Sequence, residues 1–177
     1  MNLEINWLKD NCQFLHYFGL GFIQLKINDK ERVHFYNKIL PAVTSDEEIH
    51  NHRYNFNSTI LSGELIQEQF VVVDGEEYIK EKESCKSGHS FNEPGTLCNI
   101  KKIGEHKYKK DSDYYIEHDV FHKVKSKNCI TYINRTGYLK DYAEVIRKID
   151  ADKVCPFSTG NLFSQTQLWE IITDMIK

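Results

Sequence analysis

Strand-like runs of apolar and aromatic residues, separated by turn residues, fill most of the chain. The runs lie at 22–27, 32–36, 49–61, 64–73, 76–80, 98–108, 113–116, 120–124 and 128–134. Between them, the pairs Asn28-Asp29, Ser62-Gly63 and Asp74-Gly75 are residues that tolerate left-handed turn conformations. This spacing is typical of an antiparallel barrel or sandwich.

Helical patterns are confined to the two ends of the chain. Apolar residues from Leu3 to Phe18 recur at roughly helical spacing and stop at Gly19, which predicts a short N-terminal helix. Near the other end, Ser164 followed by Gln167 resembles a capping box, and the apolar residues after it predict a final helix from about residue 164. The polar segment 84–95 is interpreted as an excursion between two strands.

Length and composition indicate one domain. A chain of 177 residues that is 40% hydrophobic can bury one core. We expect a single domain over 1–177, with a core at about 20–136 and a C-terminal extension at 137–177.

Charge and hydropathy exclude several kinds of partner. The net charge of −3 and pI near 6.2 provide no basic footprint for nucleic acid. No apolar run approaches the roughly 20 residues that span a bilayer, and charged residues interrupt any signal-peptide core. The five cysteines include no CxxC pair, which favours free thiols. We therefore expect a cytoplasmic protein that contacts neither nucleic acid nor membrane.

The strongest chemical signal is the stretch HNHRYNF, residues 50–56. In a strand, His50 and His52 project from the same face, as they would to offer two nitrogen ligands to one metal. A third histidine, His122, follows in a later strand-like run, whereas His118 is interpreted as a loop residue beside the site. A histidine pair at i and i+2 alone is often a surface feature, so His122 is needed for the metal interpretation.

The histidine pattern resembles the cupin superfamily. His50 and His52 fit the first cupin motif, G-x5-H-x-H-x3,4-E-x6-G, and Gly63 falls on its closing glycine. His122 fits the histidine of the second motif, although residues 111, 117, 119 and 126 differ from the usual glycine, proline, glycine and asparagine. The resemblance implies a double-stranded β-helix (jelly-roll) barrel with the histidines inside.

Phe56 stands where the first cupin motif usually has a glutamate ligand. A phenyl ring cannot bind a cation as a carboxylate does, so a metal here would have three neutral imidazoles, which suit iron(II), nickel, copper or zinc. Glu64 or Glu117 could supply a fourth ligand. Because only neutral imidazole ligates, we expect binding to weaken as the pH falls toward 6.5 and below.

A three-histidine cupin site is similar to that of the cysteine dioxygenase group of thiol dioxygenases, over about residues 49–135. This resemblance implies His50, His52 and His122 as ligands of iron(II) and a small thiol as substrate. The chain departs from the group at Asn57, where some members have a cysteine, and in CITYINR, which lacks the group's serine-histidine-tyrosine pattern. No arginine occupies the expected substrate-binding position; Arg53, Arg32 and Arg135 are candidates to replace it.

Three classes of function remain open. The first is an iron(II) dioxygenase acting on a small molecule, with Tyr54 and Arg53 as candidate catalytic or substrate-binding residues. The second is a metal-independent isomerase or epimerase with a histidine base and a tyrosine acid. The third is a non-catalytic cupin that binds a small ligand or a protein. Family resemblance also suggests a homodimer.

Overall fold

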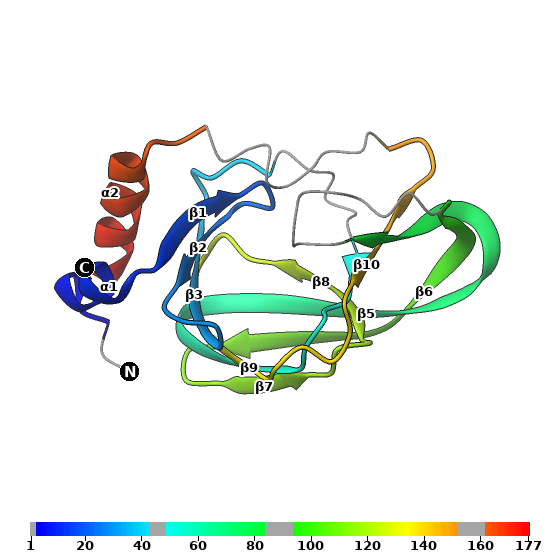
Figure 1. The fold of residues 1–177 in the computed structure, drawn as a ribbon, viewed down its shortest axis with the longest axis horizontal. Coiled ribbons are helices and arrows are strands. Elements are labelled where there is room, and N and C mark those ends of the chain that lie inside the picture. The colour runs from blue at the N-terminus through cyan, green and yellow to red at the C-terminus, as the bar shows by residue number, and fades with distance from the viewer. Residues whose placement is uncertain (1–2, 43–48, 84–93, 152–161) are drawn as a thin grey trace.

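The computed structural model describes residues 3–42, 49–83, 94–151 and 162–177 (Figure 1). Two helices, α1 (Ile5–Asn11) and α2 (Gln165–Ile176), accompany ten strands. The strands are β1 (Phe14–Phe18), β2 (Phe22–Lys26), β3 (Glu31–Asn37), β4 (Ile49–His50), β5 (Phe56–Glu83), β6 (Thr96–Lys109), β7 (Asp113–Ile116), β8 (Phe121–Lys125), β9 (Asn128–Arg135) and β10 (Ala143–Lys148). The predicted fold class, mainly β with a helix near each end, is confirmed.

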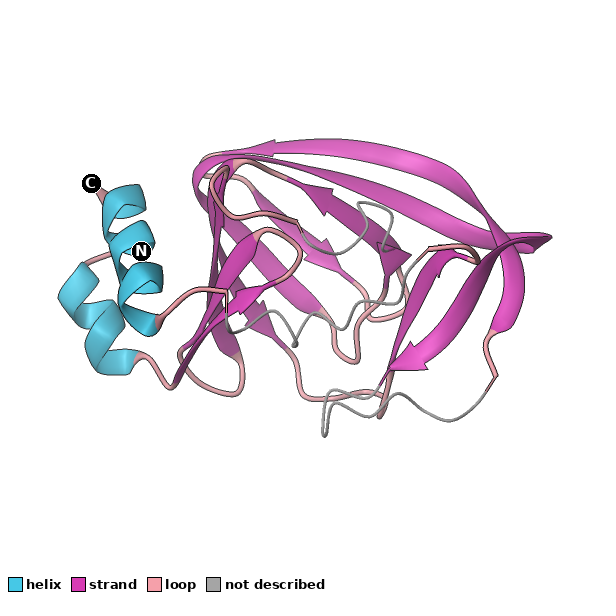
Figure 2. Cartoon of the chain, turned by 90° about the horizontal axis from the view of Figure 1, so that it is seen from above, coloured by secondary structure: helices cyan, strands magenta, loops and turns pink. Residues whose placement is uncertain are grey.

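The long strand β5 joins two halves of an antiparallel sheet system (Figure 2). Its first part pairs with β7 and β9, and β9 continues through β3 and β2 to β1. Its second part pairs with β6, β8 and β10, and β4 lies between β10 and β8. All pairings among the described strands are antiparallel, which agrees with the predicted jelly roll and argues against a parallel α/β fold.

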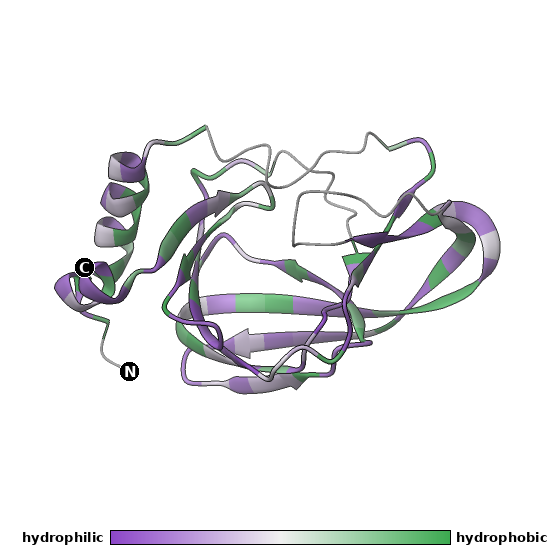
Figure 3. Ribbon diagram, in the orientation of Figure 1, coloured by the Kyte–Doolittle hydropathy of each residue, from purple (hydrophilic) through white to green (hydrophobic). Residues whose placement is uncertain are grey.

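The two helices cover the outer face of the β1–β2–β3 end (Figure 1). Alternate strand residues such as Tyr17, Ile23 and Phe35 are fully buried there against Leu168 and Ile172 of α2. Figure 3 shows hydrophobic segments of the strands and of α2 meeting at this end. The opposite face of these strands faces the second half of the sheet system.

Inside β5, the face that is buried changes at one bulge. Ser58 and Ile60 are buried before it, whereas Leu65 and Gln67 are buried after it, so the parity changes from even to odd. The register shift lies between Ile60 and Ser62, and Gly63 has a φ of 75°. A bulge inserts one residue and lets the strand continue into the second half of the sheet.

Two predicted turns and one predicted strand are therefore wrong. Ser62-Gly63 and Asp74-Gly75 both lie within β5, where register shifts replace turns. The predicted strand 49–61 is divided, because β4 ends at His50 and the chain bends at residues 53–54 before β5 begins. Glycine in a strand marks a bulge as readily as a turn, and the sequence pattern does not separate the two.

At both ends of the chain, the structure differs from the predicted N-terminal helix and from the predicted C-terminal extension at 137–177. The helix α1 ends at Asn11, and residues 14–18 form β1 because alternate residues there pack against the helical layer. The extension contains β10, which pairs with β5 and β4, so the sheet extends beyond 20–136 at both ends. The capping box of α2 at Ser164 and Gln167 is confirmed.

Three further observations concern membrane-spanning helices, the cysteines and the segment 84–95. Within the described residues, no helix has the length and apolarity needed to cross a membrane. Cys12, Cys98 and Cys129 are free thiols. Most of the predicted excursion, residues 84–93, lies outside the described residues.

Candidate metal centre

His50, His52 and His122 come together between the two halves of the sheet system. His50 is the last residue of β4 and lies directly opposite His122 of β8 in an antiparallel pair. Residues directly opposite in such a pair share a face, so both imidazoles project to the same side. His52 lies beyond the end of β4, where its backbone N–H donates to the carbonyl oxygen of His118 at 3.1 Å.

The three imidazoles form a compact triangle. Their ring centroids are 5.0 Å apart for His50 and His52, 4.8 Å for His50 and His122, and 4.9 Å for His52 and His122. One potential ligand nitrogen from each ring lies within 4.8 Å of the others. The Nε2 atoms of His52 and His122 are 3.3 Å apart. The predicted convergence of these side chains is therefore observed, while their role as ligands stays a prediction.

The surroundings of His122 indicate which of its nitrogens is available. Its Nδ1 lies 3.1 Å from the carbonyl oxygen of Val120, which can only accept a hydrogen bond, so Nδ1 carries the proton. The lone pair of a neutral ring is then on Nε2, which is directed toward His52. A backbone carbonyl holding the second nitrogen is the usual arrangement around metal-binding histidines.

Burial keeps the imidazoles of His52 and His122 neutral. Desolvation lowers the pKa of His122 to about 3, with a further contribution from the charge of His50 and a smaller opposing one from the Val120 carbonyl. Desolvation also lowers the pKa of His52 well below its usual range, as do the nearby charges of His122 and His50. Neutral imidazole is the form that binds metal, so His52 and His122 are in their ligand form at neutral pH.

One pair of nitrogens in the cluster has the spacing of two ligands of one divalent transition metal. Two nitrogens that each bind one metal at about 2.1 Å, with an angle between 90° and 109°, are separated by about 3.0 to 3.4 Å. The separation between the Nε2 atoms of His52 and His122 falls in this range. Three neutral nitrogen donors suit iron(II), nickel, copper or zinc better than a hard oxygen-binding ion.

Asn51, between the first two histidines, anchors the segment to β10. It is 1% exposed, and its amide nitrogen donates to the Glu144 carboxylate at 2.8 Å. In return, the backbone N–H of Glu144 donates to Asn51 Oδ1 at 2.7 Å. Lys80 and Lys140 pair with the same carboxylate at 3.2 and 3.6 Å. This network continues the contact with β10 beyond His50, where β4 ends.

Phe56, at the position where the first cupin motif usually has a glutamate ligand, gives the cluster an apolar neighbour, as the sequence predicts. Phe56 is 5% exposed, and its ring lies 4.9 Å from that of His52. The two proposed fourth ligands are elsewhere. Glu64 pairs with Lys107 at 2.7 Å, Glu117 is exposed, and neither belongs to the cluster of ligand atoms.

Tyr54 and Arg53, the predicted catalytic residues, lie at different distances from the histidines. The ring of Tyr54 is 5.3 Å from that of His52, so it borders the cluster. Arg53 is buried and its guanidinium lies 4.2 Å above the ring of Tyr138. Tyr138 is in turn 6.1 Å from Tyr54. Arg53 therefore reaches the periphery of the site, and a catalytic role for either residue stays a prediction.

Two polar residues of β3 also lie near the cluster: Arg32, a candidate for substrate binding from the family resemblance, and His34, to which the sequence gives no role in the site. Arg32 and His34 face the same side of β3, opposite the apolar face that packs on the helices. Both share Gln24 Oε1, at 3.0 and 3.2 Å. Their charges also lower the pKa of His52, so they lie near the cluster. Polar residues at alternate positions ordinarily indicate a solvent-facing side, and only the second sheet half makes this side internal.

His118 is a loop residue that supports the site. Its backbone N–H donates to Asn55 Oδ1 at 2.8 Å, and its Nδ1 lies 3.1 Å from the same oxygen. Asn55 also receives a bond on its backbone carbonyl from the N–H of Thr136. These contacts agree with its interpretation as a loop residue beside the cluster.

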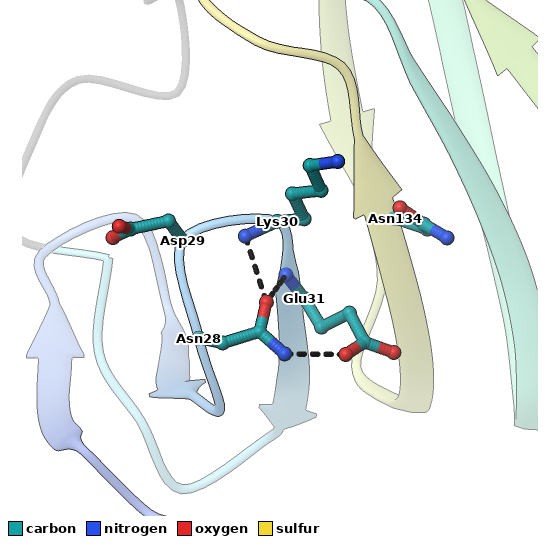
Figure 4. Close-up of a pocket in the computed structure, with 5 residues that line it drawn as sticks. All are labelled: Asn28, Asp29, Lys30, Glu31 and Asn134. Carbon is teal, nitrogen blue, oxygen red and sulfur yellow. Dashed lines mark hydrogen bonds between the residues drawn. The ribbon is translucent and has the colours of Figure 1, made fainter.

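A separate hollow lies at the turn between β2 and β3 and is lined by Asn28, Asp29, Lys30, Glu31 and Asn134 (Figure 4). Asn28 Oδ1 accepts hydrogen bonds from the backbone N–H groups of Lys30 and Glu31, at 2.8 and 2.9 Å. Such bonds are the usual way in which asparagine stabilises a turn. The predicted turn at Asn28-Asp29 is confirmed, and its polar groups serve the turn.

No family model matches the chain, and no curated protein matches its sequence. Among solved structures, it is similar to hydroquinone 1,2-dioxygenase from Sphingomonas sp. TTNP3, in a crystal structure with 4-hydroxybenzoate bound. The identity is 6%, the TM-score is 0.35, and the match covers 61% of this chain and 60% of that chain. A likeness this distant, over less than two thirds of the dioxygenase chain, assigns neither a family nor an activity.

Proposed function

We propose that His50, His52 and His122 bind one divalent metal, iron(II) in the active form, and that the protein is a metal-dependent cupin dioxygenase of small molecules. The observation that carries this proposal is the 3.3 Å separation between the Nε2 atoms of His52 and His122, two buried neutral imidazoles with His50 beside them. The same separation allows a hydrogen bond from His52 Nε2–H to His122 Nε2, so metal uptake is the measurement that distinguishes a metal site from a histidine pair.

The residues of the chain have separate tasks in this proposal. The three histidines hold the metal, and the Val120 carbonyl orients His122. Bound iron(II) with three protein ligands supplies open positions for dioxygen and an organic substrate. Phe56 keeps the wall beside His52 apolar and excludes a competing carboxylate. Tyr54 borders the open side, where it can contact the substrate.

Metal analysis of untagged protein tests the first step. We expect near-stoichiometric metal after reconstitution with iron(II) without oxygen, and loss of that metal in His50→Ala, His52→Ala and His122→Ala. His106→Ala is the matched control, because His106 is exposed on β6 and outside the cluster. A folded wild-type protein that takes up no divalent transition metal would overturn the proposal.

Oxygen uptake tests the second step. Iron-loaded protein should consume dioxygen in the presence of a small thiol such as cysteine or 3-mercaptopropionate, and the His122→Ala variant should not. Metal binding without thiol-dependent uptake would remove the thiol as substrate. A folded, metal-free protein that exchanges substrate protons would instead favour an isomerase, with a cluster histidine as base and Tyr54 as acid.

A further inference from the structure

Gln67 of β5 is fully buried, and its side chain makes no hydrogen bond. It is 0% exposed, and among the described residues neither its amide nitrogen nor its amide oxygen has a partner. By contrast, the amide nitrogen of Gln165 on α2 donates to the carbonyl oxygen of Leu15 at 3.1 Å. Burying an amide is unfavourable unless its polar atoms are hydrogen-bonded, so the Gln67 side chain requires an explanation.

Gln67 projects from the face of the sheet that carries His122. Gln69 lies directly opposite His122 in the pairing of β5 with β8, and Gln67 is two residues from Gln69 on the same strand. Residues directly opposite each other share a face, as do alternate residues of one strand, so Gln67 and His122 point to the same side. Diagonal neighbours of this kind lie about 7 to 8 Å apart. One small ligand between the two side chains can therefore contact both.

The first part of β5 faces β8 and the second part of β5 at two levels. At the histidine level, the ring of Phe56 lies 6.3 Å from that of His122. At the apolar level, Ile60 and Leu65 are buried in one hydrophobic cluster. The bulge between these two residues turns both of them to the same interior.

Ser58 and Gln67 lie between these two levels. Each is the inward residue between the histidine level and the apolar level on its own part of β5, and each is 0% exposed. Tyr114 lies directly opposite Ser58, and Val124 directly opposite Gln67. Burial raises the pKa of Tyr114 to about 12, so all four side chains are uncharged at neutral pH. This intermediate level is therefore polar and neutral.

The amide of Gln67 limits the chemistry of a group that would satisfy it. A hydroxyl or a primary amide can accept a hydrogen bond from Nε2 and donate one to Oε1, whereas a carboxylate can only accept. A site built to bond such a group discriminates against the analogue that lacks it. On the same face, His106 of β6 lies directly opposite Gln67 and is exposed, so solvent reaches this face one strand away.

We propose that Gln67, with Ser58 beside it, binds an uncharged hydroxyl or amide group of the molecule that reacts at the three-histidine centre. The reacting group of that molecule would lie at the histidine level, and its neutral polar group would lie at the intermediate level. Gln67 is thereby a specificity-determining residue. This inference rests on the proposed function for the reacting group only, because Gln67 contacts no metal in it.

Binding of matched probes tests this subsite. Phenol and toluene have nearly the same shape, but only phenol has a hydroxyl, whereas benzamide and benzoate differ in charge. We expect phenol to bind about tenfold tighter than toluene, and benzamide about tenfold tighter than benzoate. Gln67→Met should remove these preferences, and the control Gln165→Met should retain them. A preference in either pair that Gln67→Met removes supports the subsite, and the lack of any such preference overturns it.

The stability of Gln67→Met separates ligand binding from a structural role. Methionine has nearly the shape of glutamine without its amide, so the variant removes an unsatisfied polar group, and the midpoint of denaturant unfolding should rise. In Gln165→Met, which loses the bond to Leu15, the midpoint should fall. A fall for Gln67→Met would mean that its amide is already bonded in the folded protein, by ordered water for example, and would overturn the proposal.

A measurement on the unaltered protein covers a variant that fails to fold. Phenol should shift the side-chain amide resonances of Gln67 in NMR spectra and leave those of Gln165 in place. The titration is done on metal-free and on metal-loaded protein. A shift at Gln67 in a protein that takes up no metal would support the subsite and overturn the metal proposal. Metal uptake with no shift at Gln67 would overturn the subsite alone.

Discussion

Asn51 and Glu144 are joined by reciprocal hydrogen bonds, although 93 residues separate them in the chain. The Asn51 amide donates to the Glu144 carboxylate, the Glu144 backbone N–H donates to Asn51 Oδ1, and the Asn51 backbone N–H donates to the Glu144 carbonyl at 3.0 Å. Since β4 has only two residues, these bonds do much of what a longer strand would do in orienting His50 and His52.

Removing the Asn51 side chain should therefore weaken metal binding without touching a ligand. We expect Asn51→Ala to reduce metal affinity about 10- to 100-fold. Asn51→Asp should have an effect in the same direction, because a carboxylate cannot donate to Glu144 and repels it. Metal affinity is measured by competition with a chelator. Asn57→Ala, at an exposed position of β5, is the control, and equal affinities for all variants would contradict the anchoring role.

The low pKa values of His52 and His122 predict how the stability of the metal-free protein depends on pH. Below about pH 6.5, these histidines become protonated in the unfolded chain but stay neutral in the folded chain. The free energy of unfolding should therefore fall as the pH falls from 6.5 toward 3. Denaturant unfolding at several pH values should show a steeper loss for wild type than for His122→Gln. Parallel curves for the two proteins would argue against a buried neutral His122.

The pH at which the protein releases its metal should also be lower than for exposed histidine ligands. Because burial already keeps His52 and His122 neutral, protons compete with the metal at a lower pH than they would for exposed histidines. This revises the expectation from the sequence, which placed the weakening near 6.5. A pH titration of bound metal measures it, and half-release at 6.5 or above would contradict this prediction.

Phe56→Glu should change the metal preference. The Phe56 ring is buried beside His52, so a glutamate there brings a carboxylate oxygen to the cluster and should favour manganese over nickel or zinc by about tenfold. Without metal, the buried carboxylate should also lower the free energy of unfolding, and added manganese should restore it. Phe56→Leu is the control. An unchanged preference in a folded variant would mean that the new side chain points elsewhere.

Gly63→Ala should destabilise the fold through the bulge in β5. Gly63 has a φ of 75°, and a Cβ there would lie 1.9 Å from the carbonyl oxygen of Asn128. We expect a loss of about 1 to 3 kcal/mol in the free energy of unfolding, measured with denaturant. In Gly137→Ala, where a Cβ would meet nothing within 4 Å, the change should be much smaller. Equal effects would show that the bulge tolerates a side chain.

Local patterns were sufficient for the class of fold and for the histidines. The runs of strand-forming residues predicted β2, β3, β6, β7, β8 and β9 closely, because each run is bounded by turn residues in its own sequence. The capping box predicted α2 for the same reason: its hydrogen bonds join residues three apart. The parity of His50, His52 and His122 indicated one shared face, and the antiparallel pair of His50 and His122 agrees with it.

Features that depend on distant partners were decided by the tertiary structure. Residues 14–18 match a helical pattern as well as a strand, and only pairing with β2 makes them β1. Gly63 is a glycine in a turn-like pair, and only the need to carry β5 from one half of the sheet to the other makes it a bulge. Arg32 and Arg135 were candidates for substrate binding only through the family resemblance, because polar positions in strands by themselves indicate a solvent-facing side. The tertiary structure places both beside the ring of Tyr54, which in turn lies beside His52, and packing between residues so far apart in the chain leaves no local signal in the sequence.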